Sequence, residues 1–174
     1  LPKALKAGLA RAGAPKAIAD LFALWSSEIG PDLWAFCGSG LAQAGGVKEI
    51  LALPPAHVFR ISWNDPHHPP YLRALMCFDW CRQVWGSGIW DRWESEWRDI
   101  YPLDSAPAST RPLIRRLSQF IPATTAILLQ TRFRSLNGKR IPDLFDMSVL
   151  APSELKRRML SPSGNIDLRG MPSS

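Results

Sequence analysis

Basic side chains are concentrated in the last part of the chain, and phosphate binding is the chemistry that they suit best. Residues 106–174 carry 11 Lys and Arg against 4 Asp and Glu, whereas residues 1–105 carry 10 against 11. The excess charge of the chain, +6, therefore lies entirely in the last 69 residues. Most of these cations are arginines, whose planar guanidinium can form two parallel hydrogen bonds to a phosphate. Ten of them are candidate nucleic-acid contacts: Arg111, Arg115, Arg116, Arg132, Arg134, Lys139, Arg140, Lys156, Arg157 and Arg158.

The same segment has a pattern typical of a helix-turn-helix followed by a wing. Helices are expected over 111–120 and 124–134, with Pro122 between them, and Asn137-Gly138 is a strong hairpin signal. Thr124, Thr125 and Gln130 would then lie near the start or on the exposed face of the second helix. The alternative is two packed helices whose arginines only solvate the surface.

A short stretch within this segment carries residue types suited to metal-dependent hydrolysis. Ile141-Pro142-Asp143, followed by Glu154-Leu155-Lys156, resembles the motif of PD-(D/E)XK nucleases. The resemblance implies that Asp143 and Glu154 hold Mg²⁺ while Lys156 supports the attacking water. That family places its Glu-x-Lys on a core strand, whereas residues 153–160 here read as a helix capped by Ser153. In the alternative, these residues have no catalytic role and Asp143 forms an ion pair with Arg132 or Arg140.

Two histidines and two cysteines form a weaker candidate zinc site. His67 and His68 precede a helix that carries Cys77 and Cys81, and ligands four residues apart on a helix can share one Zn²⁺. That helix is apolar almost all round, and cysteine is among the most frequently buried residue types. We therefore expect buried core cysteines rather than a metal site.

Tryptophans mark the expected centre of the fold. Five of the eight lie between residues 80 and 97, on two helices separated by Gly86-Ser87-Gly88. Trp90, Trp93 and Trp97 fall at i, i+3 and i+7, so they share one face of the second helix. Aromatic side chains can stack on nucleobases, but these are surrounded by acidic residues that repel phosphate. Packing against the preceding helix or a protein partner is therefore the preferred interpretation.

The periodicity of apolar residues and the positions of Gly, Pro and capping residues predict the elements that position these residues. Helices are expected over 3–12, from Pro15 to Ile29 with an end at Gly30-Pro31, over 31–44, 70–85 and 89–101, and in the C-terminal segment as above. Strands are expected over His57–Trp63 and Ile141–Val149 because apolar and polar residues alternate there, and residues 126–133 suit a strand as well as a helix.

These elements predict a mainly α fold, α or α+β with a small β-hairpin. We expect an aromatic-rich helical core over 1–105 and a basic helical or winged subdomain over 106–160 packed on it. Residues 161–174 read as a flexible tail or linker.

Length and composition exclude several classes of protein. A chain of 174 residues with 46% hydrophobic residues can bury a substantial core, which excludes intrinsic disorder for its body. Three cysteines cannot form a disulfide framework, so a reducing, cytoplasmic compartment is expected. No apolar run approaches the ~18 residues of a membrane span. The absence of an initiator Met or a signal peptide suggests a processed chain or a piece of a longer one.

The leading functional prediction is a non-enzymatic component of a larger bacterial assembly that binds nucleic acid, DNA more than RNA, or acts as a scaffold. It would contact the phosphate backbone through the Arg-rich segment, as part of a longer chain or multiprotein complex, without catalytic residues, cofactor or metal. One alternative is an adaptor whose basic face binds an acidic protein. The enzymatic alternative is the Mg²⁺-dependent nuclease.

Overall fold

Helices make up nearly all of the regular structure. The computed structural model describes residues 1–62 and 65–160, and it is 71% helical with one small two-stranded sheet, which confirms the mainly α prediction. The helices are α1 (Pro2–Arg11), α2 (Lys16–Leu24), α3 (Ser26–Ser39), α4 (Leu41–Ile50), α5 (Pro55–Val58), α6 (Pro70–Trp85), α7 (Ile89–Ile100), α8 (Arg111–Gln119), α9 (Ile121–Gln130) and α10 (Pro152–Met159). The remaining elements are η1 (Leu103–Ser105), β1 (Arg132–Phe133), η2 (Arg134–Leu136), β2 (Lys139–Arg140) and η3 (Ile141–Leu144).

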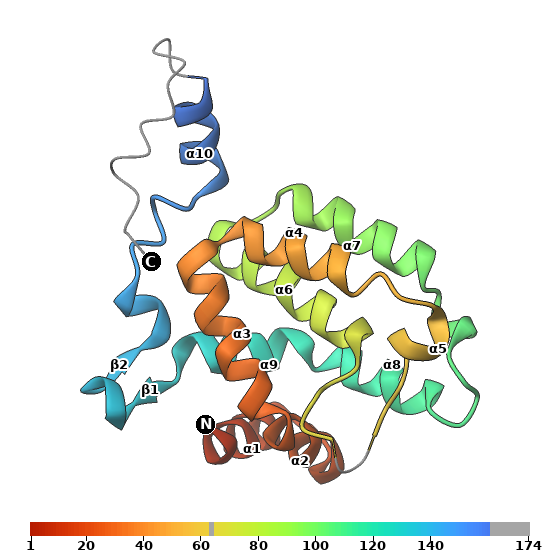
Figure 1. Cartoon of the computed structure of the whole chain (residues 1–174). Coiled ribbons are helices and arrows are strands. Elements are labelled where there is room, and N and C mark those ends of the chain that lie inside the picture. The colour runs from red at the N-terminus through yellow and green to blue at the C-terminus, as the bar shows by residue number, and fades with distance from the viewer. Residues whose placement is uncertain (63–64, 161–174) are drawn as a thin grey trace.

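Helix α6 is the centre of the molecule. Ten of its sixteen residues are buried, and it packs against α4, α7 and α9 (Figure 1). Helices α1 and α2 form a pair at the lower end of the same view, and α1 also packs on α9. One continuous apolar cluster extends from Leu5 on α1 to Ile141 on η3. Because Ile114 and Leu128 belong to this cluster, the basic segment shares the core of the N-terminal helices; the proposed division at residue 105 stays a prediction.

The tryptophan-rich helices pack as predicted. Trp80, Trp90 and Trp97 are almost fully buried, and Trp93 is half-buried with its ring 6.4 Å from that of Phe78. Such contacts bury large aromatic surfaces and stabilise the core. The face shared by Trp90, Trp93 and Trp97 is thus used for packing and is not a platform for bases.

A buried carboxylate ties three helices together. Asp79 of α6 accepts hydrogen bonds from Thr125 Oγ1 of α9, from Gln83 Nε2 at 2.5 Å and from Arg82 Nη1 at 3.2 Å. Arg82 also binds Glu94 of α7 through Nη2 at 2.6 Å. Every oxygen of this buried carboxylate therefore has a partner, which is the condition for a stable buried charge.

The expected helix end at Gly30-Pro31 is wrong. The chain turns at Trp25 instead, and α3 continues through Pro31 to Ser39. A proline inside a helix removes one backbone hydrogen bond, but here Ile29 and Leu33 on either side are fully buried. Tertiary packing supplies most of the stability of a helix, so these contacts hold α3 together across the proline.

Both predicted strands outside the hairpin are wrong. Over His57–Trp63 the chain begins with the end of α5, and the consecutive side chains Val58 and Phe59 are both fully buried, which an alternating strand does not allow. Trp63 lies outside the described residues. Over Ile141–Val149 the chain starts with the 3₁₀ turn η3, because Asp143 Oδ2 accepts the backbone N–H of Arg140 at 2.9 Å and closes the chain on itself.

The predicted helix cap at Ser153 is wrong. Ser153 lies inside α10 because Pro152 takes the first position. Thr110 precedes α8, and its hydroxyl donates to the carbonyl of Pro107 and not to the helix. The predicted tail, residues 161–174, lies outside the described residues. Among the described helices, none combines the length and apolar character needed to cross a bilayer.

Candidate functional site

A two-stranded hairpin brings four of the candidate cations together. Arg132 of β1 pairs with Arg140 of β2, and Phe133 pairs with Lys139. The predicted Asn137-Gly138 turn is confirmed: both residues have left-handed backbone angles, with φ of 53° and 76°. Asparagine and glycine are the residues that tolerate this conformation best, and together with η2 they connect the paired residues Phe133 and Lys139. We call residues 132–140 the basic hairpin.

The four cations of the basic hairpin differ in how their charge is used. Arg140 binds Asp143 through Nη2 at 2.5 Å, and this pair lowers the pKa of the Asp143 carboxyl to about 2. The side chains of Arg132, Arg134 and Lys139 are exposed and make no ion pair with any described residue. Arg132 Nη1 donates only to the Gly138 carbonyl, at 3.0 Å. The hairpin therefore presents to solvent three cations that form no direct ion pair with a described carboxylate.

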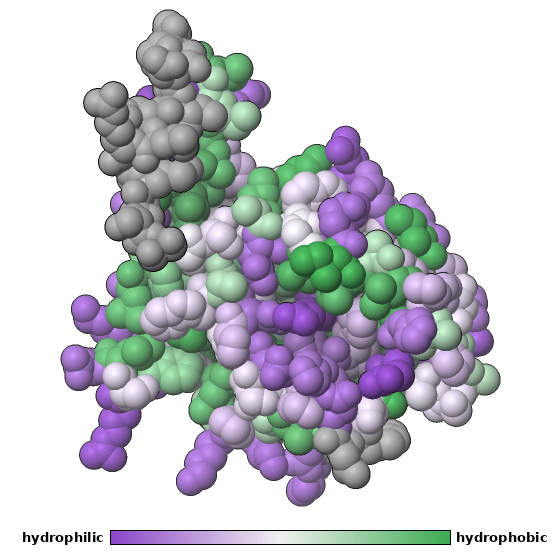
Figure 2. All heavy atoms as spheres, in the orientation of Figure 1, coloured by the Kyte–Doolittle hydropathy of each residue, from purple (hydrophilic) through white to green (hydrophobic). Residues whose placement is uncertain are grey.

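An apolar hollow lies directly beside the basic hairpin. It is lined by Gly30, Pro31 and Trp34 of α3 and by Ile141, the residue that follows Arg140, and its volume is about 390 Å³. Trp34 is 47% exposed, although its ring packs edge-to-face with that of Phe145, with 5.2 Å between the ring centres. Figure 2 shows green surface flanked by projecting purple side chains at the end of the molecule that carries β1 and β2. The exposure of Trp34 was not predicted from the sequence, because nothing in its neighbours indicates an exposed tryptophan.

The cations of α8 have separate surroundings. Arg111 is half-buried and donates through Nη2 to the carbonyls of Asp104 at 2.7 Å and Ala106 at 3.0 Å, so it fastens η1 to the start of the helix. Arg115 is exposed, and the guanidinium of Arg116 lies 5.0 Å from the centre of the Phe120 ring. Arg111 thus has a structural role, while the two exposed arginines remain available to a ligand.

The cations of α10 surround one carboxylate. Glu154 accepts hydrogen bonds from Arg157 Nη2 at 2.7 Å and from Arg158 Nε at 2.7 Å, and these bonds lower its pKa to about 2. Lys156 is exposed. Two of the three α10 cations are therefore engaged within their own helix. Figure 1 shows α10 standing apart from the helices of the core.

The predicted readout by a second helix is wrong. Thr124 and Thr125 are fully buried, and their hydroxyls donate to the carbonyl of Phe120 and to Asp79, respectively. Only Pro122 and Gln130 of α9 are exposed, because α9 packs against both α1 and α6. A recognition helix must present one face to the groove of DNA, and α9 has no such face. Pro122, which was expected between the two helices, lies in the first turn of α9.

The nuclease-like residues are each bound within their own segment. Asp143 pairs with Arg140, as in the alternative without a catalytic role, and Glu154 pairs with arginines of α10. Glu154 and Lys156 lie on a helix, not on the core strand that carries this motif in the nuclease family. Over residues 1–62 and 65–160, no group of three or more His, Cys, Asp or Glu side chains is placed to hold a metal ion.

The expectation of core cysteines is confirmed. Cys77 and Cys81 are fully buried, and burial raises the pKa of the Cys81 thiol to about 12. Burial also raises the pKa of the Cys77 thiol. A buried thiol with a raised pKa stays protonated, and protonated thiols are poor metal ligands and nucleophiles.

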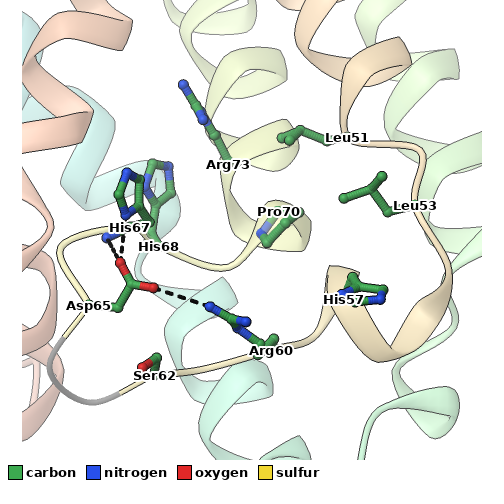
Figure 3. A pocket seen from close by; sticks show the side chains of 10 residues that line it. All are labelled: Leu51, Leu53, His57, Arg60, Ser62, Asp65, His67, His68, Pro70 and Arg73. Atoms are coloured by element: carbon green, nitrogen blue, oxygen red, sulfur yellow. Dashed lines mark hydrogen bonds and ion pairs between the residues drawn. The ribbon is translucent and has the colours of Figure 1, made fainter.

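The histidines have a different arrangement, which the sequence analysis missed. All three histidines of the chain, His57, His67 and His68, line one pocket between the end of α4 and the start of α6 (Figure 3). We call it the histidine pocket; its volume is about 300 Å³, and Arg60 and Arg73 also line it. The available signal was their spacing, since the three fall within 12 residues.

Asp65 organises one side of the histidine pocket. Its carboxylate accepts the backbone N–H of His67 at 3.0 Å, contacts His67 Nδ1 at 2.5 Å and accepts from Arg60 Nη2 at 3.4 Å. These contacts lower the pKa of Asp65. On the other side, Arg73 holds the buried Asp32 of α3 through Nε at 2.7 Å and Nη2 at 2.5 Å.

Comparison with known proteins assigns neither site: no family model, no curated protein and no solved structure matches this chain.

Proposed function

We propose that the protein binds single-stranded nucleic acid with the basic hairpin and receives an unpaired base in the neighbouring apolar hollow. One observation carries the proposal: the hairpin that holds three exposed cations without ion-pair partners, Arg132, Arg134 and Lys139, leads directly into Ile141. That residue lines the same apolar hollow as the exposed Trp34.

The charge arrangement supports an anionic ligand. Like charges repel when cross-strand neighbours bring them together, and here Arg132 lies opposite Arg140. Asp143 forms its direct ion pair with Arg140 and interacts with Arg132 only at longer range. A polyanion that follows the hairpin would neutralise the remaining cations and release condensed counterions, which favours binding.

The hollow supports a ligand with a flat apolar part. Tryptophan is enriched at interaction surfaces, and Trp34 is exposed beside other apolar residues of the hollow. Base stacking on an aromatic side chain tolerates any sequence, but it requires a base that is not paired in a duplex. The combination therefore favours single strands over double helices.

Fluorescence anisotropy of a labelled oligonucleotide over a salt series tests the proposal. Three phosphate contacts predict a slope of log affinity against log salt of about −2 for a single strand, at roughly −0.7 per contact. Replacing Arg132, Arg134 and Lys139 together by Gln should abolish this slope. In the control, Arg11, Lys16 and Arg92 are replaced by Gln. This removes the same number of positive charges from exposed positions outside the hairpin and should leave the slope unchanged.

Trp34→Ala separates stacking from charge. Loss of one stacked base should weaken binding by about 1–3 kcal/mol. Because no phosphate contact is removed, the salt slope should stay the same, and Trp34→Phe should recover part of the affinity.

Three results would overturn the proposal. They are the absence of oligonucleotide binding at low salt, an equal loss of affinity in the control variant, and a preference for duplex. Binding of polyglutamate as tightly as the oligonucleotide would instead favour an acidic protein partner.

A further inference from the structure

The histidine pocket gathers hydrogen-bond donors that the described protein leaves unused. Arg73 holds Asp32 with Nε and Nη2, so its Nη1 has no partner among residues 1–62 and 65–160. Arg60 uses only Nη2, in a long contact of 3.4 Å with Asp65, and its side chain is 66% exposed. His57 and the hydroxyl of Ser62 line the same space from α5 and the segment that follows it (Figure 3).

A buried polar atom at the pocket also lacks a partner. His68 is 5% exposed, and its Nδ1 makes no hydrogen bond with the described chain. Its other nitrogen, Nε2, lies 3.9 Å from Asp32 Oδ2. An unsatisfied buried polar group is costly, and such atoms in native proteins commonly face water or a ligand.

The opposite side of the pocket is apolar. Leu51 and Leu53 at the end of α4 face Pro70 at the start of α6 across the space (Figure 3). A pocket with apolar walls and a few convergent polar groups is the usual form of a small-molecule site.

We infer that the histidine pocket binds a small organic oxyanion, a carboxylate or a phosphate monoester, whose apolar part rests on Leu51, Leu53 and Pro70. Guanidinium groups bind oxyanions through paired N–H donors, and Arg60 and Arg73 both line the pocket. A cationic ligand would meet two guanidiniums, since the carboxylates of Asp65 and Asp32 are already engaged by His67 and Arg73. A neutral apolar ligand would leave the arginine donors without acceptors.

The composition of the chain provides a direct reporter. Because all three histidines line this pocket, the imidazole signals in a long-range ¹H–¹⁵N spectrum of the labelled protein report on it alone. The basic hairpin contains no histidine, so this measurement is independent of nucleic-acid binding.

The experiment titrates benzoate, phenyl phosphate and inorganic phosphate, with benzyl alcohol and benzylamine as neutral and cationic controls. Benzoate or phenyl phosphate should shift the imidazole signals with one common, saturable dissociation constant, and the controls should not. A response to benzoate alone identifies a carboxylate ligand, and a response to phenyl phosphate alone identifies a phosphate monoester. Weaker binding of inorganic phosphate than of phenyl phosphate would show that the apolar walls contribute.

Arg60→Gln provides the matched variant. The side chain is largely exposed, so the fold and its amide spectrum should be unchanged, while loss of a charged donor should weaken binding about tenfold. Arg92→Gln, also exposed but located on α7, should bind as the unsubstituted protein does. The inference is overturned by the absence of a saturable shift at millimolar ligand, by equal shifts with benzyl alcohol, or by unchanged affinity in Arg60→Gln.

Discussion

The Asp32–Arg73 pair should be one of the strongest single contacts between α3 and α6, and its removal gives a sharp test of the structure. The Asp32 side chain is 7% exposed and that of Arg73 30% exposed, and two hydrogen bonds of 2.7 and 2.5 Å join them. Arg73→Leu keeps most of the side-chain volume but leaves the carboxylate buried without its counter-charge. The aspartate, not the arginine, therefore determines the magnitude of the effect.

The expected loss follows from the behaviour of buried ion pairs. Removing one partner of such a pair costs about 3–5 kcal/mol in the free energy of unfolding. For a chain of this size, that loss lowers the melting temperature by about 6–20 °C. The double variant Asp32→Leu/Arg73→Leu replaces both charges with apolar groups and should recover most of the stability, because no uncompensated charge remains.

Urea unfolding followed by tryptophan fluorescence measures these free energies. Lys16→Ala serves as the control, since it breaks a pair whose lysine is 89% exposed and should cost less than about 1 kcal/mol. The reasoning is refuted if Arg73→Leu costs no more than Lys16→Ala, or if the double variant is as unstable as the single one.

Two further predictions concern buried polar groups. Thr125→Val removes the hydroxyl that donates to Asp79 and should cost about 1–3 kcal/mol in urea unfolding, whereas Thr110→Val, whose hydroxyl contacts only a backbone carbonyl at the surface, should cost much less. Burial lowers the pKa of His68 to about 3, so between pH 6.5 and about 3 the unfolded chain binds a proton there that the folded chain does not. Above pH 6.5 His68 does not make the free energy of unfolding depend on pH. Between pH 6.5 and about 3, the free energy of unfolding falls by about 1.4 kcal/mol for each pH unit of acidification. In His68→Gln the loss disappears, so the stability of the variant relative to the unsubstituted protein should rise on acidification, and parallel pH profiles would contradict the prediction.

Sequence patterns predicted the elements whose signals are local and strong. Asn137-Gly138 fixed the hairpin because two adjacent left-handed residues leave the backbone few alternatives. The tryptophans at i, i+3 and i+7 predicted α7 because a single face had to be buried. In both cases the decisive information lies within a few residues of the chain.

The errors arise where distant contacts outweigh local preference. Helix α3 passes through Pro31 because Ile29 and Leu33 pack in a core built from other helices. The histidine pocket joins the end of α4 to the start of α6, so its existence depends on how two separated helices pack. Trp34 looks like a core residue in sequence, and its 47% exposure depends on which distant segments, such as that of Phe145, pack beside it.

The arrangement of carboxylates changes what the net charge of the basic segment means for binding. Arg140 is held by Asp143, and Arg157 is held by Glu154, so a phosphate at either arginine would compete with a carboxylate already in place. If all ten candidate cations contacted a single strand, the salt slope would be about −7, whereas the three cations of the hairpin alone give about −2. A measured slope near −2 would therefore fit contact by the three hairpin cations alone, with both ion pairs left in place. A slope near −7 would show that the ligand displaces those carboxylates.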